Sequence, residues 1–408
     1  MIAFVRRIAY LGLLTALAGC AALAPLLSQP TPAPVSPTTA TPLPSPLMTP
    51  TTTLSPGPQI LRIWLPPRFD PSADTPAAQL LNQRLQEFES AHPGLQLDVR
   101  IKAEAGNASL LDALTLAGAA APSVLPDLIA LPHADMELAV SKGLLHPMDG
   151  LSTLLDDPNW YPYARELGHV QGIGYGLTFA GDALVFLHRP DLELSTWEAV
   201  FALKEPLSFA AGDERALVLL SLYVSAGGRF ITEQGRPMLE EAPLTQTLSF
   251  LQAGLTTNTF TPSLLDLKTD EDVFQLYRDG RARMVIAWSA QKNLPIDTIP
   301  PLNAPHTFAD GWMWSLAGAA PEKQQVATEL AEFLMEAEFL RRWTEAAGYL
   351  PTRITQDTPE RSVLESAQAI PPQEVLSVLG PVLEEALKRV WGGEAVPGVV
   401  RSVMEQVQ

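Results

Sequence analysis

Cysteine is almost absent from this chain, because Cys20 is the only one among 408 residues. A lone cysteine excludes an internal disulfide and any metal cluster built on several thiolates. Histidine is scarce as well, with six dispersed residues, and the chain contains no H-E-x-x-H, G-x-S-x-G or P-loop lysine motif. We therefore expect no metal, no cofactor and no catalytic site.

Positive charge is also in short supply. Lysine and arginine total 27 against 45 aspartates and glutamates, for a net charge of −18, which argues against nucleic acid or an anionic membrane surface as a partner of the folded part. The acid pairs Asp156-Asp157, Glu240-Glu241 and Glu384-Glu385 are adjacent in sequence. Adjacent side chains diverge, whereas a glycosidase needs two acids facing each other at roughly 5–10 Å. A glycoside-processing enzyme is therefore only a minor alternative.

The single cysteine ends a segment with the organisation of a secretory signal. Arg6 and Arg7 precede an apolar run over 8–17, and Ala18 and Gly19 lead to Cys20. This run is too short to span a bilayer. The end of the segment, Leu-Ala-Gly-Cys, resembles the lipobox of bacterial lipoproteins, which implies that the Cys20 sulfur carries a diacylglycerol with acyl chains such as palmitate. The alternative is an ordinary signal peptide with an incidental cysteine.

The next segment is too poor in apolar side chains to form a core. Gln29–Pro58 contains ten prolines and eight threonines, and no charged residue occurs between Ile8 and Leu61. Such a chain is typical of an extended, partly polyproline-II linker. At roughly 3.1 Å per residue it reaches at most about 90 Å. We interpret 1–20 as a lipoprotein signal and 21–58 as a disordered tether, the alternative being an N-terminus without such a role.

Strands and helices alternate after this tether. Apolar runs at 60–65, 95–101 and 126–131 predict strands, and amphipathic stretches at 75–92, 109–121 and 133–145 predict helices. This order is typical of an α/β fold with a mostly parallel sheet flanked by helices. Further apolar runs at 281–288 and 311–318 predict buried strands, and 321–343 predicts one long amphipathic helix.

Four segments in order resemble extracellular solute-binding proteins of family 1, the maltose-binding-protein-like receptors of ABC importers. They are PDLIALPHADMELAVSKGLLHPMDGL from Pro126, YGLTFAGDALVFLHRPDL from Tyr175, YRDGRARMVIAW from Tyr277, and the stretch from Gly311 to Arg353. The sequence departs from the family pattern at FLHRP and at Gly311-Trp312, where the family often has Gly-Gly. Both departures lie near the expected ligand cleft.

The resemblance implies a two-lobed periplasmic-binding-protein fold, type II-like, whose lobes are joined by crossing strands and close on a ligand. We expect lobe I to comprise 59–180 plus 313–355, and lobe II to comprise 181–312 plus 356–408. Gly181 stands where the first strand crosses between lobes and is the candidate hinge residue, since glycine rotates without a side-chain clash.

Aromatic rings and carboxylates are the groups that recognise a sugar. Trp312 and Trp314 are two residues apart on a predicted strand, so both rings should point to one face. The candidate ligand-binding residues also include two tryptophans at predicted strand ends, a carboxylate beside the hinge, a histidine after the third strand and a tyrosine in a turn: Trp288, Trp64, Asp182, His133 and Tyr349. For each of these residues, a packing or surface role remains the alternative.

We therefore predict a monomeric, non-enzymatic lipoprotein on the extracytoplasmic face of the cell membrane. It captures a small polar solute, a sugar or oligosaccharide, and passes it to the transmembrane subunits of an ABC permease. A lipid-anchored scaffold or degenerate receptor without ligand is the other alternative.

Overall fold

The computed structural model describes residues 59–189, 192, 194–290, 295–318, 320–355, 358 and 360–407, all within one compact unit, Pro56–Gln408. The signal segment, Cys20 and the proline-rich tether lie outside the described residues. No helix of the described part is both long and apolar enough to span a membrane.

A mixed sheet of eight strands forms the centre of the unit, in the order β2-β1-β3-β9-β6-β8-β7, with β10 pairing with β9. The strands are β1 (Gln59–Leu65), β2 (Leu95–Ile101), β3 (Leu128–Pro132), β6 (Gly176–His188), β7 (Leu207–Ser208), β8 (Met284–Trp288), β9 (Thr307–Leu316) and β10 (Ala367–Ala369). A separate two-stranded sheet pairs β4 (His169–Val170) with β5 (Ile173–Gly174).

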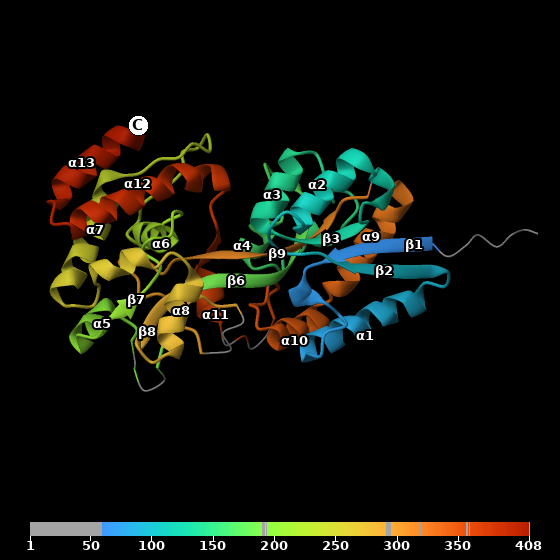
Figure 1. Cartoon of the computed structure of the whole chain (residues 1–408), viewed down its shortest axis with the longest axis horizontal. Helices are drawn as coiled ribbons and strands as arrows, with labels where there is room; N and C mark the ends of the chain where they lie inside the picture. Colours follow the sequence, from blue (N-terminus) through green and yellow to red (C-terminus); the bar gives the residue numbers. More distant parts are fainter. Residues whose placement is uncertain are drawn as a thin grey trace, which may run out of the picture. The chain divides into compact units, whose positions relative to one another are not determined.

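Helices cover both ends of this sheet (Figure 1). The first group surrounds β1, β2 and β3 and comprises α1 (Pro76–Ala91), α2 (Leu110–Ala120), α3 (His133–Ser141), α4 (Pro162–Leu167), α9 (Pro321–Leu334) and α10 (Ala337–Ala347). The second group surrounds β7 and β8 and comprises α5 (Trp197–Leu203), α6 (Leu217–Ser225), α7 (Glu241–Thr256), α8 (Asp270–Arg278), α12 (Gln373–Trp391) and α13 (Val396–Val407). The remaining elements are α11 (Arg361–Ser366) and the short 3-10 helices η1 (Pro67–Phe69), η2 (Pro122–Val124), η3 (Leu154–Asp156) and η4 (Pro262–Asp266).

Strands β6 and β9 run between the two groups of helices (Figure 1). The first part of β6, 176–183, pairs with most of β9, 309–315, and the last half of β9 is bound on its other side by β3. The second half of β6 pairs with β8. Within each group the other neighbouring strands, β1 with β2 and β3, and β7 with β8, are parallel, whereas β6 and β9 are antiparallel to each other. Both crossing strands therefore belong to both halves of the fold.

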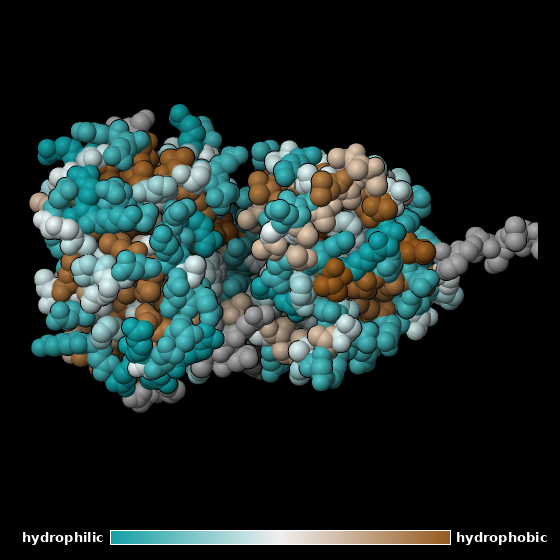
Figure 2. All heavy atoms as spheres, viewed as in Figure 1, coloured by the Kyte–Doolittle hydropathy of each residue, from teal (hydrophilic) through white to brown (hydrophobic). Residues whose placement is uncertain are grey.

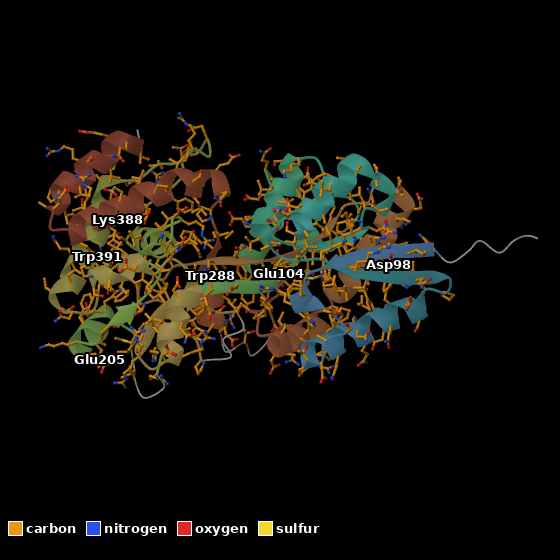
Figure 3. The ribbon with its side chains drawn as sticks, in the orientation of Figure 1. Asp98, Glu104, Glu205, Trp288, Lys388 and Trp391 are labelled. Atoms are coloured by element: carbon orange, nitrogen blue, oxygen red, sulfur yellow. The ribbon has the colours of Figure 1, made fainter. Side chains whose placement is uncertain are left out.

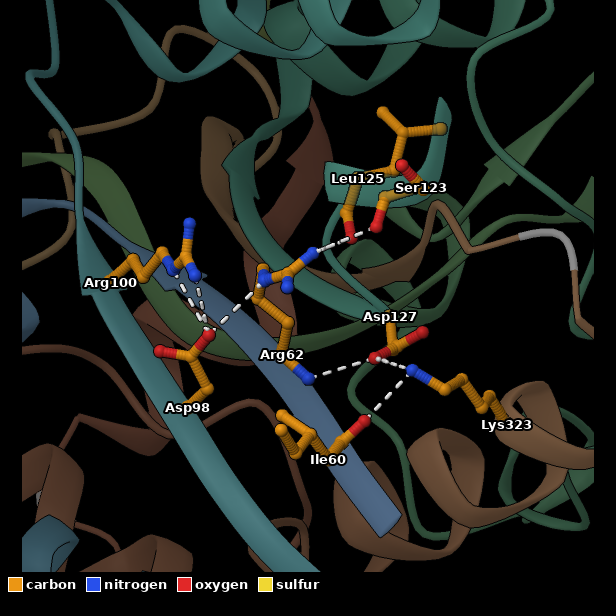
Figure 4. Close-up of polar contacts among 8 residues, drawn as sticks. All are labelled: Ile60, Arg62, Asp98, Arg100, Ser123, Leu125, Asp127 and Lys323. Carbon is orange, nitrogen blue, oxygen red and sulfur yellow. Dashed lines mark hydrogen bonds and ion pairs between the residues drawn. The ribbon is translucent and has the colours of Figure 1, made fainter. Parts of the chain in front are cut away.

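A polar network fastens the outer strands of the first group (Figure 4). The backbone N–H of Arg62 in β1 donates to Asp127 Oδ2 at 2.8 Å, and its Nε donates to Asp98 Oδ2 in β2 at 3.2 Å. Lys323 in α9 donates from Nζ to the carbonyl of Ile60 at 2.8 Å. Asp127 is buried, and the Arg62 N–H together with the Lys323 ammonium, 3.4 Å from Asp127 Oδ2, supplies the hydrogen bonds that a buried carboxylate requires.

The stretch predicted as one helix over 321–343 is two helices, so that prediction was wrong. Helix α9 ends at Leu334, and α10 begins at Ala337 with Glu336 as its N-cap. The Glu336 carboxylate accepts hydrogen bonds from the backbone N–H groups of Glu338 and Phe339, at 3.1 and 3.0 Å. This cap satisfies donors that a new helix leaves free, while the apolar periodicity continues across the break and hides it.

Candidate functional site

A cavity of about 210 Å³ lies where β6 and β9 cross between the two halves of the fold. Its wall contains residues from both groups of elements and from both crossing strands: Arg68, Pro132, Asp182, Arg215, Trp288, Asp310, Gly311, Trp312 and Tyr349. Pro132 ends β3 and Trp288 ends β8. The carboxyl ends of strands from the two halves thus meet at this cavity, which is where α/β sheets place their ligands.

Two tryptophans form the aromatic part of the wall. Trp312 is partly exposed, its ring lies 5.1 Å from that of Phe69 in edge-to-face geometry, and the Arg68 guanidinium lies 5.2 Å from its centroid. Trp288, labelled near the middle of the molecule in Figure 3, is also partly exposed. Its backbone N–H donates to Asp270 Oδ1 at 2.6 Å, which ties the end of β8 to the start of α8.

Trp314 lies deeper than the sequence pattern predicted. It is 3 % exposed and stacks on Phe179, with ring centroids 4.4 Å apart. Phe69 contacts both Trp312 and Phe179, so the two tryptophans share a face of the sheet, as the alternation requires. Trp314, however, is part of the apolar core and does not line the cavity.

The floor of the cavity carries two carboxylates side by side. Asp182 of β6 and Asp310 of β9 are directly paired across the antiparallel ladder, so their side chains leave the sheet on the same face. Asp182 Oδ1 accepts hydrogen bonds from the backbone N–H of Ala183 at 2.9 Å, from Ser289 Oγ at 2.8 Å and from the backbone N–H of Ala290 at 2.7 Å. Asp310 Oδ1 accepts from the N–H of Gly311 at 2.7 Å.

Burial makes both carboxyls weak acids. It raises the pKa of Asp182 to about 7, against the hydrogen bonds from Ser289 and Ala290, and the charges of Asp270 and Asp310 raise this pKa further. Burial likewise raises the pKa of Asp310, although His133, the Gly311 N–H and Arg215 act in the opposite direction. At neutral pH Asp182 is therefore poised between the protonated and the ionised state.

An arginine from the first half of the fold positions the tyrosine of the wall. Arg68 donates from Nη1 to Tyr349 Oη at 2.9 Å and from Nε to Glu104 Oε1 at 2.8 Å. Glu104 is labelled near the middle of Figure 3. Tyr349 is 7 % exposed and its ring lies parallel to that of Trp343. Arg68 thereby joins η1, the loop before α2 and the turn after α10 at one edge of the cavity.

The sequence profile of the family described as bacterial extracellular solute-binding protein matches residues 83–362. This match covers more than half of the chain. The chain belongs to this family. The predicted resemblance is therefore confirmed, and extracytoplasmic location follows from the description of the family. The family is one of substrate-binding proteins, not of enzymes.

Solved structures share the fold. The cyclic α-maltosyl-1,6-maltose binding protein from Arthrobacter globiformis is similar at a TM-score of 0.69 and 14% identity, covering 86% of this chain and 98% of that chain. A cyclo/maltodextrin-binding protein complexed with maltotetraose is similar at a TM-score of 0.67 and 20% identity, and the match covers 87% of this chain and 97% of that chain. The sugar-binding protein MalE from Xanthomonas citri is similar at a TM-score of 0.66 and 16% identity, and the match covers 86% of this chain and 96% of that chain. No curated protein matches the sequence. The two-lobed α/β fold predicted for this solute-binding protein is thus confirmed.

A furrow runs between the two lobes of this solute-binding protein on the face seen in Figure 2. At the crossing of the lobes, Gly181 lies opposite Gly311 and forms a bridge with Leu350 through two backbone hydrogen bonds of 3.0 and 2.8 Å. A Cβ at residue 181 would lie 2.1 Å from Tyr163 Oη. Glycine is therefore required here for the close approach of Tyr163, and the hinge role of Gly181 stays a prediction.

Two other candidate residues lie outside the cavity wall of the solute-binding protein. His133 begins α3 and is buried, with its Nε2 3.8 Å from Glu137 Oε1. Trp64 is 3 % exposed, and the Lys102 ammonium lies 4.7 Å from the centroid of its ring. Both pack within the first lobe, which is the alternative that the sequence left open for each.

Sequence reasoning missed three charged residues of the wall, namely Arg68, Arg215 and Asp310. Arg68 follows the end of β1 in a Pro-Pro-Arg-Phe-Asp stretch, so the rule that placed candidates at strand ends could have found it. Asp310 stands two residues before Trp312, but its partnership with Asp182 depends on strand register. Arg215, in the loop before α6, had no sequence signal that we can identify.

A second cavity of about 150 Å³ adjoins the first within the second lobe. The two cavities share Arg215 and Trp288, and Asp213, Lys268 and Asp270 contribute further charges to the second. Arg215 Nε lies 3.3 Å from Asp213 Oδ1. Within the part of the chain that the structure describes, no group of three or more His, Cys, Asp or Glu side chains could hold a metal ion.

Proposed function

We propose that this protein is the receptor of an ABC importer and captures a sugar or oligosaccharide in the cavity at the crossing of β6 and β9. The observation that carries the proposal is the composition of that wall, where Trp288 and Trp312 stand beside the hydrogen-bonding groups of Asp182, Asp310 and Tyr349. Indole rings suit the apolar faces of a sugar, and carboxylates accept hydrogen bonds from its hydroxyls. The saccharides in the names of the similar structures, maltotetraose among them, support the same class of solute.

Closure of the two lobes around the solute is the means by which a permease would distinguish a loaded from an empty receptor. The lobes we propose are 59–180 with 313–355 and 181–312 with 356–408, connected at the pairs Gly181–Gly311 and Asp182–Asp310. A solute that contacts both lobes stabilises the closed form by its additional contacts. Helix α10 packs on α1 within the first proposed lobe, and α12 and α13 pack on α7 within the second. These contacts support the two lobes as separate packing units.

Calorimetry with a panel of oligosaccharides, polyols and amino acids tests this function. We expect a saccharide to bind at about micromolar affinity, near −8 kcal/mol, without turnover, and its saturation to reduce the radius of gyration in small-angle scattering. Product formation would indicate an enzyme, and the absence of binding by every compound of the panel would indicate a scaffold. An unchanged radius with a bound saccharide would contradict lobe closure.

Trp312 is the aromatic residue whose loss should weaken binding most directly. Trp312→Ala should reduce affinity for the best saccharide by at least about fivefold, on the order of 1 kcal/mol, because an indole plate is removed from the wall. Trp312→Phe, which keeps a ring, is the matched control and should retain most of the affinity. If Trp312→Ala lowers only the melting temperature and leaves affinity intact, the ring is a packing residue.

We further propose that Cys20 is lipidated and that the proline-rich segment after it tethers the receptor to the extracytoplasmic face of the membrane. The Leu17–Cys20 pattern and the uncharged chain up to Leu61 support this. In cells fed a labelled fatty acid, the wild-type chain should carry the label and partition into detergent. Cys20→Ser should lose both properties; persistence of the label on Cys20→Ser would contradict the proposal.

A further inference from the structure

The charged residues of the main cavity are not balanced. Arg68 forms an ion pair with Glu104, and Arg215 forms one with Asp213. In contrast, neither Asp182 nor Asp310 forms an ion pair with any described side chain. Among the described residues, the cations of the wall thus have carboxylate partners of their own, and the two floor carboxylates have no cationic partner.

Each floor carboxylate also has an oxygen that no described residue binds. The hydrogen bonds to Asp182 and Asp310 from described residues all end on Oδ1. Among the described residues, no donor reaches Oδ2 of either, and both residues are partly exposed and line the cavity. Within the described part of the chain, Oδ2 of each carboxylate is thus available to water or to a solute.

The pairing of the strands sets the distance between the two carboxylates. Residues directly opposite each other in an antiparallel pair have Cβ atoms about 4.5–5.5 Å apart, and Asp182 faces Asp310 in this way. Two ionised carboxylates at such a distance repel each other, and the repulsion is stronger where the surroundings exclude water. The pair is relieved when one group binds a proton or when a cation lies between them.

We infer that the solute carries a protonated amine beside its hydroxyls, as in an amino sugar or a short amino-oligosaccharide, and that this amine binds between Asp182 and Asp310. An ammonium donates charge-assisted hydrogen bonds to both carboxylates, and these are roughly twice as strong as bonds from a neutral hydroxyl. The nearby indole of Trp288 adds a surface that attracts cations. This inference rests on the proposed function, because it names the saccharide class for the same cavity.

The decisive comparison uses pairs of ligands in which N-acetylation removes the charge of the amine, with a neutral saccharide to control for the bulk of the acetyl group. Calorimetry at pH 7 and low salt would measure glucosamine, galactosamine and their dimers and trimers, each against its N-acetylated counterpart, with the best neutral saccharide of the first panel as reference. We expect at least one free amine to bind about tenfold or more tighter than its acetylated counterpart and the neutral reference, and this preference to fall as salt screens the charges.

Variants of the two carboxylates test where the amine binds. Asp182→Asn, Asp310→Asn and the double variant keep the size of each side chain and remove its charge. The double variant should lose at least about tenfold in affinity for the free amine and prefer it by less than about twofold. Asp156→Asn is the matched control, since that carboxylate is outside this cavity and its side chain is 97% exposed; it should behave as the wild type.

The outcomes separate this inference from the function on which it rests. If acetylated or neutral saccharides bind as tightly as every free amine, the amine inference is overturned and the sugar receptor stands. If the preference for the amine survives in a folded double variant, the proposed binding position is overturned. If no saccharide of either panel binds, the proposed function fails, and the inference fails with it.

Discussion

Replacing Gly181 with alanine should lower the free energy of unfolding by about 3 kcal/mol or more, an unusually large loss for one added methyl group. The new Cβ would lie 2.1 Å from Tyr163 Oη and 3.0 Å from the carbonyl oxygen of Leu350. Neither neighbour can move freely, because Tyr163 is fully buried with its hydroxyl bonded to the carbonyl of Pro351 at 3.0 Å, and Leu350 is bridged to residue 181. Chemical denaturation of both proteins measures the difference.

A matched control and a rescue make this result specific. A Cβ added to Gly398 in α13 would meet no atom within 4 Å, so Gly398→Ala should be neutral or stabilise by up to about 1 kcal/mol, the usual preference of a helix for alanine. Tyr163→Phe removes the clashing oxygen, so Gly181→Ala should cost less in that background. An equal cost in both backgrounds would show that Tyr163 is not the obstacle.

The stability of the protein should depend on pH through the two floor carboxylates. Because the pKa of Asp182 is raised from 3.8 to about 7 in the folded state, the folded protein retains a proton that the unfolded chain has released between about pH 4 and 7. The free energy of unfolding contributed by this group therefore falls as pH rises through that window, and the loss is complete above pH 7. The charge of Asp310 also raises the pKa of Asp182, so the titration belongs to the pair rather than to Asp182 alone.

Asp182→Asn tests this dependence, because the variant lacks the titrating group and its free energy of unfolding can be compared with that of the wild type at each pH. Asparagine keeps an oxygen for the N–H of Ala290 and the hydroxyl of Ser289 but does not titrate. From pH 5 to pH 8 the variant should gain about 2 kcal/mol relative to the wild type, because this range covers only the upper part of the window and because water screens the partly exposed Asp182. Urea unfolding at the two pH values measures the gain. Asp156→Asn should show no such change, and a constant difference for Asp182→Asn would contradict the buried titration.

The local elements of the fold follow from short-range patterns. The apolar runs at 60–65, 95–101 and 126–131 became β1, β2 and β3 within a residue or a few at each end. Periodicity was insufficient at Glu336, where a cap ends one helix and starts another while the apolar spacing continues. A cap depends on the position of one side chain, which a hydrophobic pattern does not encode.

The candidate site was only partly predictable for a related reason. Alternation along a strand states which face a side chain takes, and it correctly grouped Trp312 with Trp314. It does not predict how deeply each side chain is buried. Trp312 reaches the cavity, whereas Trp314 stacks on Phe179 in the core. Trp288, Asp182 and Tyr349 line the cavity as well, but their binding of ligand stays a prediction.

Composition and periodicity were enough to predict an acidic, cysteine-poor α/β chain preceded by a secretory pattern and an uncharged linker, and the resemblance of four ordered segments pointed to the solute-binding family. These properties depend on composition, on periodicity and on the order of segments, all of which are local. Only the folded chain shows that Asp310 faces Asp182, that Arg68 binds Tyr349 and that Tyr163 requires a glycine at 181. Each of these contacts joins residues far apart in the chain, and it exists only once strand register and lobe packing have been set.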